Sequence, residues 1–89
     1  MPTTRLLIKG KVQGVFYRAG AKEIAKNIGI TGWIKNVANG DVEVLVTGTT
    51  AQIMEFINWC WQGPGKAMVT DIGITEEPEE GFSDFVVKR

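Results

Sequence analysis

The stretch from residue 10 to residue 18 carries residue types that could bind an anion. It reads Gly-Lys-Val-Gln-Gly-Val-Phe-Tyr-Arg, and it joins a strand pattern to a helix pattern. Gly10 and Gly14 let the backbone turn, so that successive N–H groups can point at one spot. The helix N-terminus adds free N–H groups, and Arg18 adds a planar cation that can grip a phosphate or carboxylate with two hydrogen bonds. The stretch therefore predicts an anion-binding loop.

The spacing within this loop does not match a nucleotide-binding motif. No Gly-Lys-Ser/Thr follows, as it does in a Walker A loop, and Gly10 and Gly14 lack the G-x-G-x-x-G spacing of the dinucleotide-binding fold. Taken alone, the loop is equally compatible with a tight strand-to-helix connection that ends in a solvated arginine. Two interpretations, an anion site and a structural turn, are open at this point.

A second segment, residues 32–48, begins Gly-Trp-Ile-Lys-Asn. Together with residues 10–18 it resembles the acylphosphatase family, whose signatures are a G-x-V-Q-G-V-x-F-R loop and a later G-W-V-x-N-x-x-x-G-x-V segment. The resemblance extends over essentially the whole chain in length and element order. Tyr17 and Ile34 depart from the usual residues, and we interpret both as changes in packing. The matching positions are Gly10, Val12, Gln13, Gly14, Val15, Arg18, Gly32, Trp33, Asn36, Gly40, Val42 and Gly48.

This resemblance implies a phosphoryl-transfer site and gives roles to particular residues. Arg18 would hold the phosphoryl group. Asn36 would orient the attacking water, because an amide oxygen accepts a hydrogen bond without taking a proton. Without the resemblance, Asn36 would be interpreted as a residue that bonds its own backbone before a turn. The residues whose backbone amides are implied to bind substrate are Gln13, Gly14, Val15, Phe16 and Tyr17.

Other reactive or charged side chains are interpreted as structural. The side chain of Gln13 is expected to bond within the loop and fix its shape. Cys60 falls on the apolar stripe of the second helix pattern, which predicts a buried thiol. Asp41 and Glu43 are expected to carry solvated carboxylates, and the acidic run at residues 76–80 is expected to be a solvated hairpin tip.

The composition excludes several classes of protein. With 89 residues the chain is expected to form one domain, residues 1–89. Ten basic residues balance ten acidic ones, so no nucleic acid is expected as a partner, and no apolar run approaches the roughly 18 residues of a membrane span. The absence of histidine removes the usual general base and zinc ligand, so no metal or cofactor is expected. With one cysteine and no signal-peptide pattern, we expect a cytoplasmic protein. We also expect it to be a monomer.

The hydrophobic pattern predicts an α+β fold, a ferredoxin-like α/β sandwich. Two helices are expected on one face of an antiparallel sheet, in the order βαββαβ plus a terminal strand. Asn39-Gly40 is expected to form a type I′ turn between the two middle strands, and Thr49 with Gln52 a capping box at the second helix. Strands are predicted at residues 5–9, 31–37, 42–47, 67–75 and 82–88, with helices before residue 29 and from residue 49 to residue 62.

The function that the resemblance implies is hydrolysis of an acyl phosphate, a small-molecule substrate, to a carboxylate and phosphate. The alternative is a non-catalytic ferredoxin-like module that uses the same loop to bind an anion or a partner. The combination of Arg18 and Asn36 favours the enzyme, because a pure anion-binding protein has no use for a water-orienting asparagine. An RNA-binding sheet is disfavoured, because the chain has no RNP-type aromatic pattern and a net charge of zero.

Overall fold

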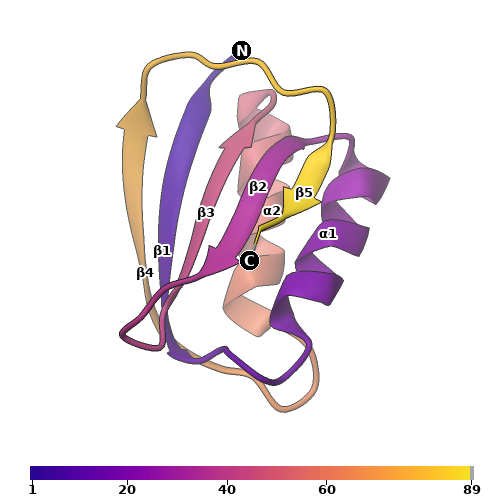
Figure 1. Cartoon of the computed structure of the whole chain (residues 1–89). Coiled ribbons are helices and arrows are strands. Elements are labelled where there is room, and N and C mark those ends of the chain that lie inside the picture. Colours follow the sequence, from indigo (N-terminus) through magenta and orange to yellow (C-terminus); the bar gives the residue numbers. More distant parts are fainter. Residues whose placement is uncertain (89) are drawn as a thin grey trace.

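The computed structural model describes residues 1–88, which form five strands and two helices (Figure 1). Both helices cover the same face of a single sheet, and the opposite face is open. The elements are β1 (Thr3–Lys11), α1 (Tyr17–Ile28), β2 (Thr31–Asn36), β3 (Val42–Thr47), α2 (Thr50–Gln62), β4 (Met68–Glu77) and β5 (Phe85–Val87).

The sheet has the strand order β4-β1-β3-β2-β5. β1 pairs antiparallel with both β3 and β4, and β2 pairs antiparallel with β3. The predicted fold class is therefore confirmed, with one difference of detail. β5 lies parallel to β2, with Trp33 opposite Val86, so the sheet is mixed rather than wholly antiparallel.

The connection between the last two strands differs from the prediction. β4 and β5 lie at opposite edges of the sheet, so residues 78–84 cross one end of the sheet and do not form a hairpin tip (Figure 1). β4 continues through Glu77, and β5 is confined to Phe85–Val87 where residues 82–88 were predicted. A strand of three residues carries almost no alternation, so its pattern cannot indicate which edge it joins.

Charged residues on the open face of the sheet form a small network. The Arg5 guanidinium contacts the carboxylate of Glu43, and its Nε lies 3.4 Å from Glu77 Oε2. Lys35 Nζ lies 3.6 Å from the other oxygen of Glu43. The prediction that these carboxylates are solvated is wrong, because the side chains of Glu43 and Glu77 are only 19% and 26% exposed.

The hydrophobic core lies between the sheet and the two helices. Leu6 and Ile8 of β1 are fully buried, as are alternate residues of β3, because successive strand residues face opposite sides. Burial of each large apolar side chain contributes about 1.5–3 kcal/mol to folding. The residues that the helices bury in this core are Tyr17, Ala21, Ala25, Ile53, Phe56 and Cys60. This packing fixes the start of α1 relative to the ends of β1 and β2.

The helix ends agree with the sequence. Thr49 Oγ1 accepts a hydrogen bond from the Gln52 N–H at 3.1 Å, and Gln52 Oε1 accepts one from the Thr49 N–H at 2.9 Å, so the predicted capping box is confirmed. Gly29 ends α1 with a φ of 92°. In the described part of the chain, neither helix is long and apolar enough to cross a membrane.

Candidate active site

The loop between β1 and α1 has the backbone geometry of an anion-binding nest. Gly14 and Phe16 both lie in the left-handed region, with φ of 73° and 62°, and they alternate with Val15, whose φ is negative. This alternation turns successive N–H groups toward a common point. Phe16 is the one residue other than glycine with a positive φ among residues 1–88, and its side chain is 84% exposed. Strain of this kind is tolerated where a site needs a particular backbone shape.

The N–H groups of this loop have no partner within the described residues. The first hydrogen bond at the start of α1 runs from the Gly20 N–H to the Phe16 carbonyl oxygen, at 3.0 Å. No side chain caps the helix at Phe16. The N–H groups of residues 14–19 thus have no acceptor in residues 1–88, and the loop is not closed by internal bonds.

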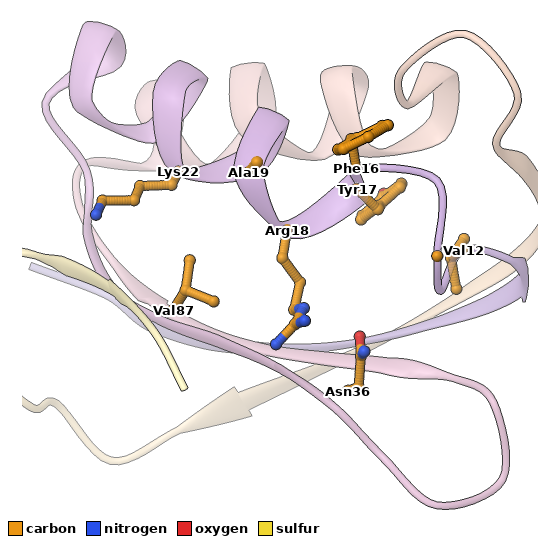
Figure 2. Close-up of a pocket in the computed structure, with 9 residues that line it drawn as sticks. Val12, Phe16, Tyr17, Arg18, Ala19, Lys22, Asn36 and Val87 are labelled. Atoms are coloured by element: carbon orange, nitrogen blue, oxygen red, sulfur yellow. The ribbon is translucent and has the colours of Figure 1, made fainter. Parts of the chain in front are cut away.

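Arg18 lies on the first turn of α1 and points toward the end of β2 (Figure 2). Its Nη1 donates a hydrogen bond to the Lys88 carbonyl oxygen at 3.1 Å, which holds the guanidinium beside the end of β5. In residues 1–88 no carboxylate forms a salt bridge with Arg18. The remaining donors of this guanidinium are therefore available to an anionic ligand.

Asn36 is the last residue of β2 and lies opposite Val42 of β3. Its side chain projects toward the cleft below Arg18 (Figure 2). Among residues 1–88 this side chain forms no hydrogen bond, so the alternative in which Asn36 bonds its own backbone is not observed. Both the oxygen and the nitrogen of its amide can therefore interact with a bound molecule.

These residues line one cleft of about 520 Å³. Four of them, Val12, Ala19, Lys22 and Val87, were not predicted from the sequence as site residues. Lys22 follows Arg18 by four residues, a spacing that places two side chains on the same face of a helix, so the sequence did contain a signal for it. Of the residues that the structure describes, two cations and no carboxylate line the cleft. Its lining residues are Val12, Gly14, Phe16, Tyr17, Arg18, Ala19, Lys22, Asn36 and Val87.

Gln13 connects the loop to the hairpin that follows Asn36. Its Nε2 donates to the carbonyl oxygens of Val37 and Asp41, each at 2.8 Å. The prediction that this side chain bonds within its own loop is wrong, because its acceptors lie on another segment. The two hydrogen bonds fix the position of the loop relative to the end of β2.

The hairpin turn itself also differs from the prediction. A type I′ turn needs a positive φ at both central residues, but Asn39 has a negative φ and only Gly40, at 96°, is positive. The Gly40 N–H donates to the Val37 carbonyl oxygen at 3.1 Å, and the Val37 N–H to the Asp41 carbonyl oxygen at 3.0 Å. The connection is therefore a three-residue loop that ends in a left-handed glycine. The two residues that flank this loop, Val37 and Asp41, carry the carbonyl oxygens to which Gln13 donates.

Tyr17 anchors the other side of the loop in the core. It is 1% exposed, and its hydroxyl donates to the Cys60 carbonyl oxygen at 2.6 Å. In a longer helix the N–H four residues on would bond this carbonyl, but that residue is Pro64, which has no N–H. Burial, with a smaller contribution from Cys60, raises the pKa of Tyr17, so its hydroxyl stays protonated and can donate.

Comparisons with known proteins agree with this arrangement. A model of the acylphosphatase family matches residues 4–87. An acylphosphatase from Marinobacter nauticus is 41% identical over 81 residues, which cover 90% of this chain and 88% of the relative. A solved acylphosphatase structure from Coxiella burnetii has a TM-score of 0.93 at 38% identity, and covers 98% of this chain and 92% of its own. One from Bacillus subtilis has a TM-score of 0.97 at 32% identity, with 100% of both chains covered. On the strength of this match over nearly its whole length, the chain belongs to the acylphosphatase family.

Proposed function

We propose that this protein hydrolyses acyl phosphates with Arg18 and the loop amides as the phosphoryl-binding groups and Asn36 as the residue that orients the attacking water. The observation that carries the proposal is the run of N–H groups at residues 14–19, which have no acceptor within residues 1–88. Arg18 lines the cleft beside them and has no carboxylate partner within the same residues. Phosphoryl transfer asks a protein mainly for positioning and for stabilisation of negative charge. Convergent N–H groups and a guanidinium supply both.

Asn36 provides what an anion-binding loop alone does not need. Its amide oxygen can accept a hydrogen bond from a water, and its amide nitrogen can donate one to a phosphoryl oxygen. The side chain is free to do this because it has no partner within residues 1–88. The hydrogen bonds of Gln13 to the following hairpin hold this strand end beside the loop.

The proton balance needs no base from the protein. The water oxygen forms a bond to phosphorus, the bond between phosphorus and the bridging oxygen breaks, and that oxygen leaves as part of a carboxylate. One proton of the water stays on the attacking oxygen, and the other passes to an oxygen of the phosphoryl group. The chain has no histidine, and no carboxylate among residues 1–88 lines the cleft, so we assign the role of proton acceptor to the substrate.

We expect the reaction to proceed without a metal ion. Among residues 1–88 no three His, Cys, Asp or Glu side chains are grouped so that they could hold one. Arg18 then takes the charge-neutralising part that Mg²⁺ plays in kinases.

Hydrolysis of benzoyl phosphate in water enriched in ¹⁸O tests the proposal directly. We expect turnover that is unchanged by a chelator, with the label in phosphate and none in benzoate, because the water attacks phosphorus. Label in benzoate would mean attack at the carbonyl carbon and would contradict the role given to the loop. A strict requirement for added Mg²⁺ would contradict the role given to Arg18.

A further inference from the structure

The cleft extends beyond the place where the loop and Arg18 meet. Its volume is about 520 Å³, whereas a phosphoryl group needs the space of only a few water molecules, about 30 Å³ each. The far end is lined by Lys22, and the stretch between the two cations by Ala19 and Val87 (Figure 2). Beyond the phosphoryl group, the cleft is therefore apolar in its middle and cationic at its end.

The geometry of the reaction assigns this part of the cleft to the acyl group. In phosphoryl transfer the attacking and leaving oxygens lie roughly in line through phosphorus. Figure 2 shows the guanidinium of Arg18 between Asn36 on one side and Lys22 on the other. With the water at Asn36, the leaving carboxylate points toward Lys22. This step rests on the function proposed above.

We propose that Lys22 binds an anionic group on the acyl part of the substrate, so that the protein favours acyl phosphates with a second negative charge. Lys22 is exposed and forms no salt bridge with residues 1–88, so its ammonium is available. A helix rises about 1.5 Å per residue, so Lys22 begins about 6 Å further along α1 than Arg18. Its ammonium points away from Arg18 (Figure 2), which suits a distal carboxylate or phosphate better than the phosphoryl group itself.

Two rigid substrates that differ by one carboxylate group test this assignment. Benzoyl phosphate has a neutral ring, and 4-carboxybenzoyl phosphate carries a carboxylate that cannot fold back onto its own anhydride. The measured quantity is the ratio of kcat/KM for the charged substrate to kcat/KM for the neutral one. We expect Lys22→Gln to lower this ratio about two- to fivefold, the scale of a solvent-exposed ion pair. The effect should shrink as salt is added, because exposed charges are screened.

Lys26→Gln is the matched control. Lys26 lies one further turn along α1, carries the same charge and does not line the cleft, so its loss should leave the ratio unchanged. An equal ratio in the parent and in Lys22→Gln would overturn this inference alone. An unchanged ratio in which kcat/KM falls equally for both substrates would instead place Lys22 at the phosphoryl group. If the parent protein hydrolyses neither substrate, the proposed function fails as well.

Discussion

Two arginines, Arg5 and Arg18, show how one residue type is used in two ways in this protein. Arg5 lies on the open face of the sheet between the carboxylates of Glu43 and Glu77. Burial acts to lower the pKa of its guanidinium, but the hydrogen bonds with the two carboxylates outweigh burial and raise it. Arg18 lines a cleft to which residues 1–88 contribute no carboxylate, and its one acceptor among these residues is the carbonyl of Lys88.

The difference between the two environments indicates which arginine can act on a ligand. The charge of Arg5 is neutralised by the fold, so this residue ties three strands together. The guanidinium of Arg18 is held by a neutral acceptor, the Lys88 carbonyl, and no carboxylate of residues 1–88 compensates its charge. A site for an anion is thus marked by the absence of a carboxylate and by free N–H groups beside the cation.

Replacement of the two arginines should separate these roles most strongly. We expect Arg18→Ala to lower kcat/KM about 10³-fold, roughly 4 kcal/mol of transition-state stabilisation, with the fold retained. Arg18→Lys should lose nearly as much, because an ammonium cannot form the bidentate fork. Arg5→Ala should instead keep the activity and lose about 1 kcal/mol or less of stability. Kinetics with benzoyl phosphate and denaturant unfolding of all three variants measure this. Near-normal turnover in Arg18→Ala would contradict the comparison.

Asn36→Ala should have the next largest effect, and only on turnover. We expect kcat to fall about 100-fold, the scale at which misplacement of a reacting group is felt. Inhibition by inorganic phosphate should change little, because the phosphate depends on Arg18 and the loop amides. Turnover and phosphate inhibition are measured on the same preparation. If both fall in proportion, Asn36 shapes the anion site and does not orient the water.

Gln13→Met should produce a smaller loss, because Gln13 acts through other residues. The variant keeps the length of the side chain but removes the two hydrogen bonds to the hairpin after Asn36. We expect kcat to fall by up to about tenfold, because a small displacement of the strand end misplaces the water relative to the phosphoryl group. The dissociation constant for phosphate should be nearly unchanged. A loss of phosphate affinity with unchanged kcat would mean that Gln13 shapes only its own loop.

The sequence predicted the anion loop because its chemistry is local. Gly14 at a left-handed position and Arg18 at a helix start lie within five residues, and the structure brings them to one cleft. Asn36 lies on another element, and only the family resemblance gave it a role. Lys22 had a local signal, its spacing from Arg18, which by itself describes many exposed lysines.

Other parts of the site depend on tertiary contacts that no local pattern encodes. The Lys88 carbonyl meets Arg18 only because β5 joins the edge next to α1, and a three-residue strand does not specify its edge. Gln13 has its acceptors on a hairpin more than twenty residues away. The Asn39-Gly40 pair fits both a type I′ turn and a longer loop with one left-handed glycine, and pairing of the strands selects the second.

Tyr17→Phe should affect stability more than catalysis. The substitution removes the donor to the buried Cys60 carbonyl, and Pro64 cannot replace it. An unsatisfied buried carbonyl costs about 1–3 kcal/mol, which corresponds to several degrees in Tm for a domain of this size. Because phenylalanine keeps the ring in the core, the loop should hold its shape and kcat should change little. Unchanged thermal stability would show that water replaces the hydroxyl.

The smallest effect on activity is expected at Cys60, which does not line the cleft. Cys60 is fully buried, and burial raises the pKa of its thiol to about 12, although the hydrogen bond with Tyr17 acts in the other direction. In the unfolded chain the thiol titrates at about pH 8.5. Its contribution to stability is therefore complete below that pH and is lost as the pH rises toward 12.

Iodoacetamide at about pH 8 should label Cys60 in urea but not in the folded protein, whose turnover should be unaffected. In Cys60→Ala, stability should fall less steeply with pH above about 9 than in the parent. Stoichiometric alkylation of the folded protein with loss of activity would place the thiol in contact with the site. Cys60 would then not be a neutral core residue separate from the anion-binding cleft.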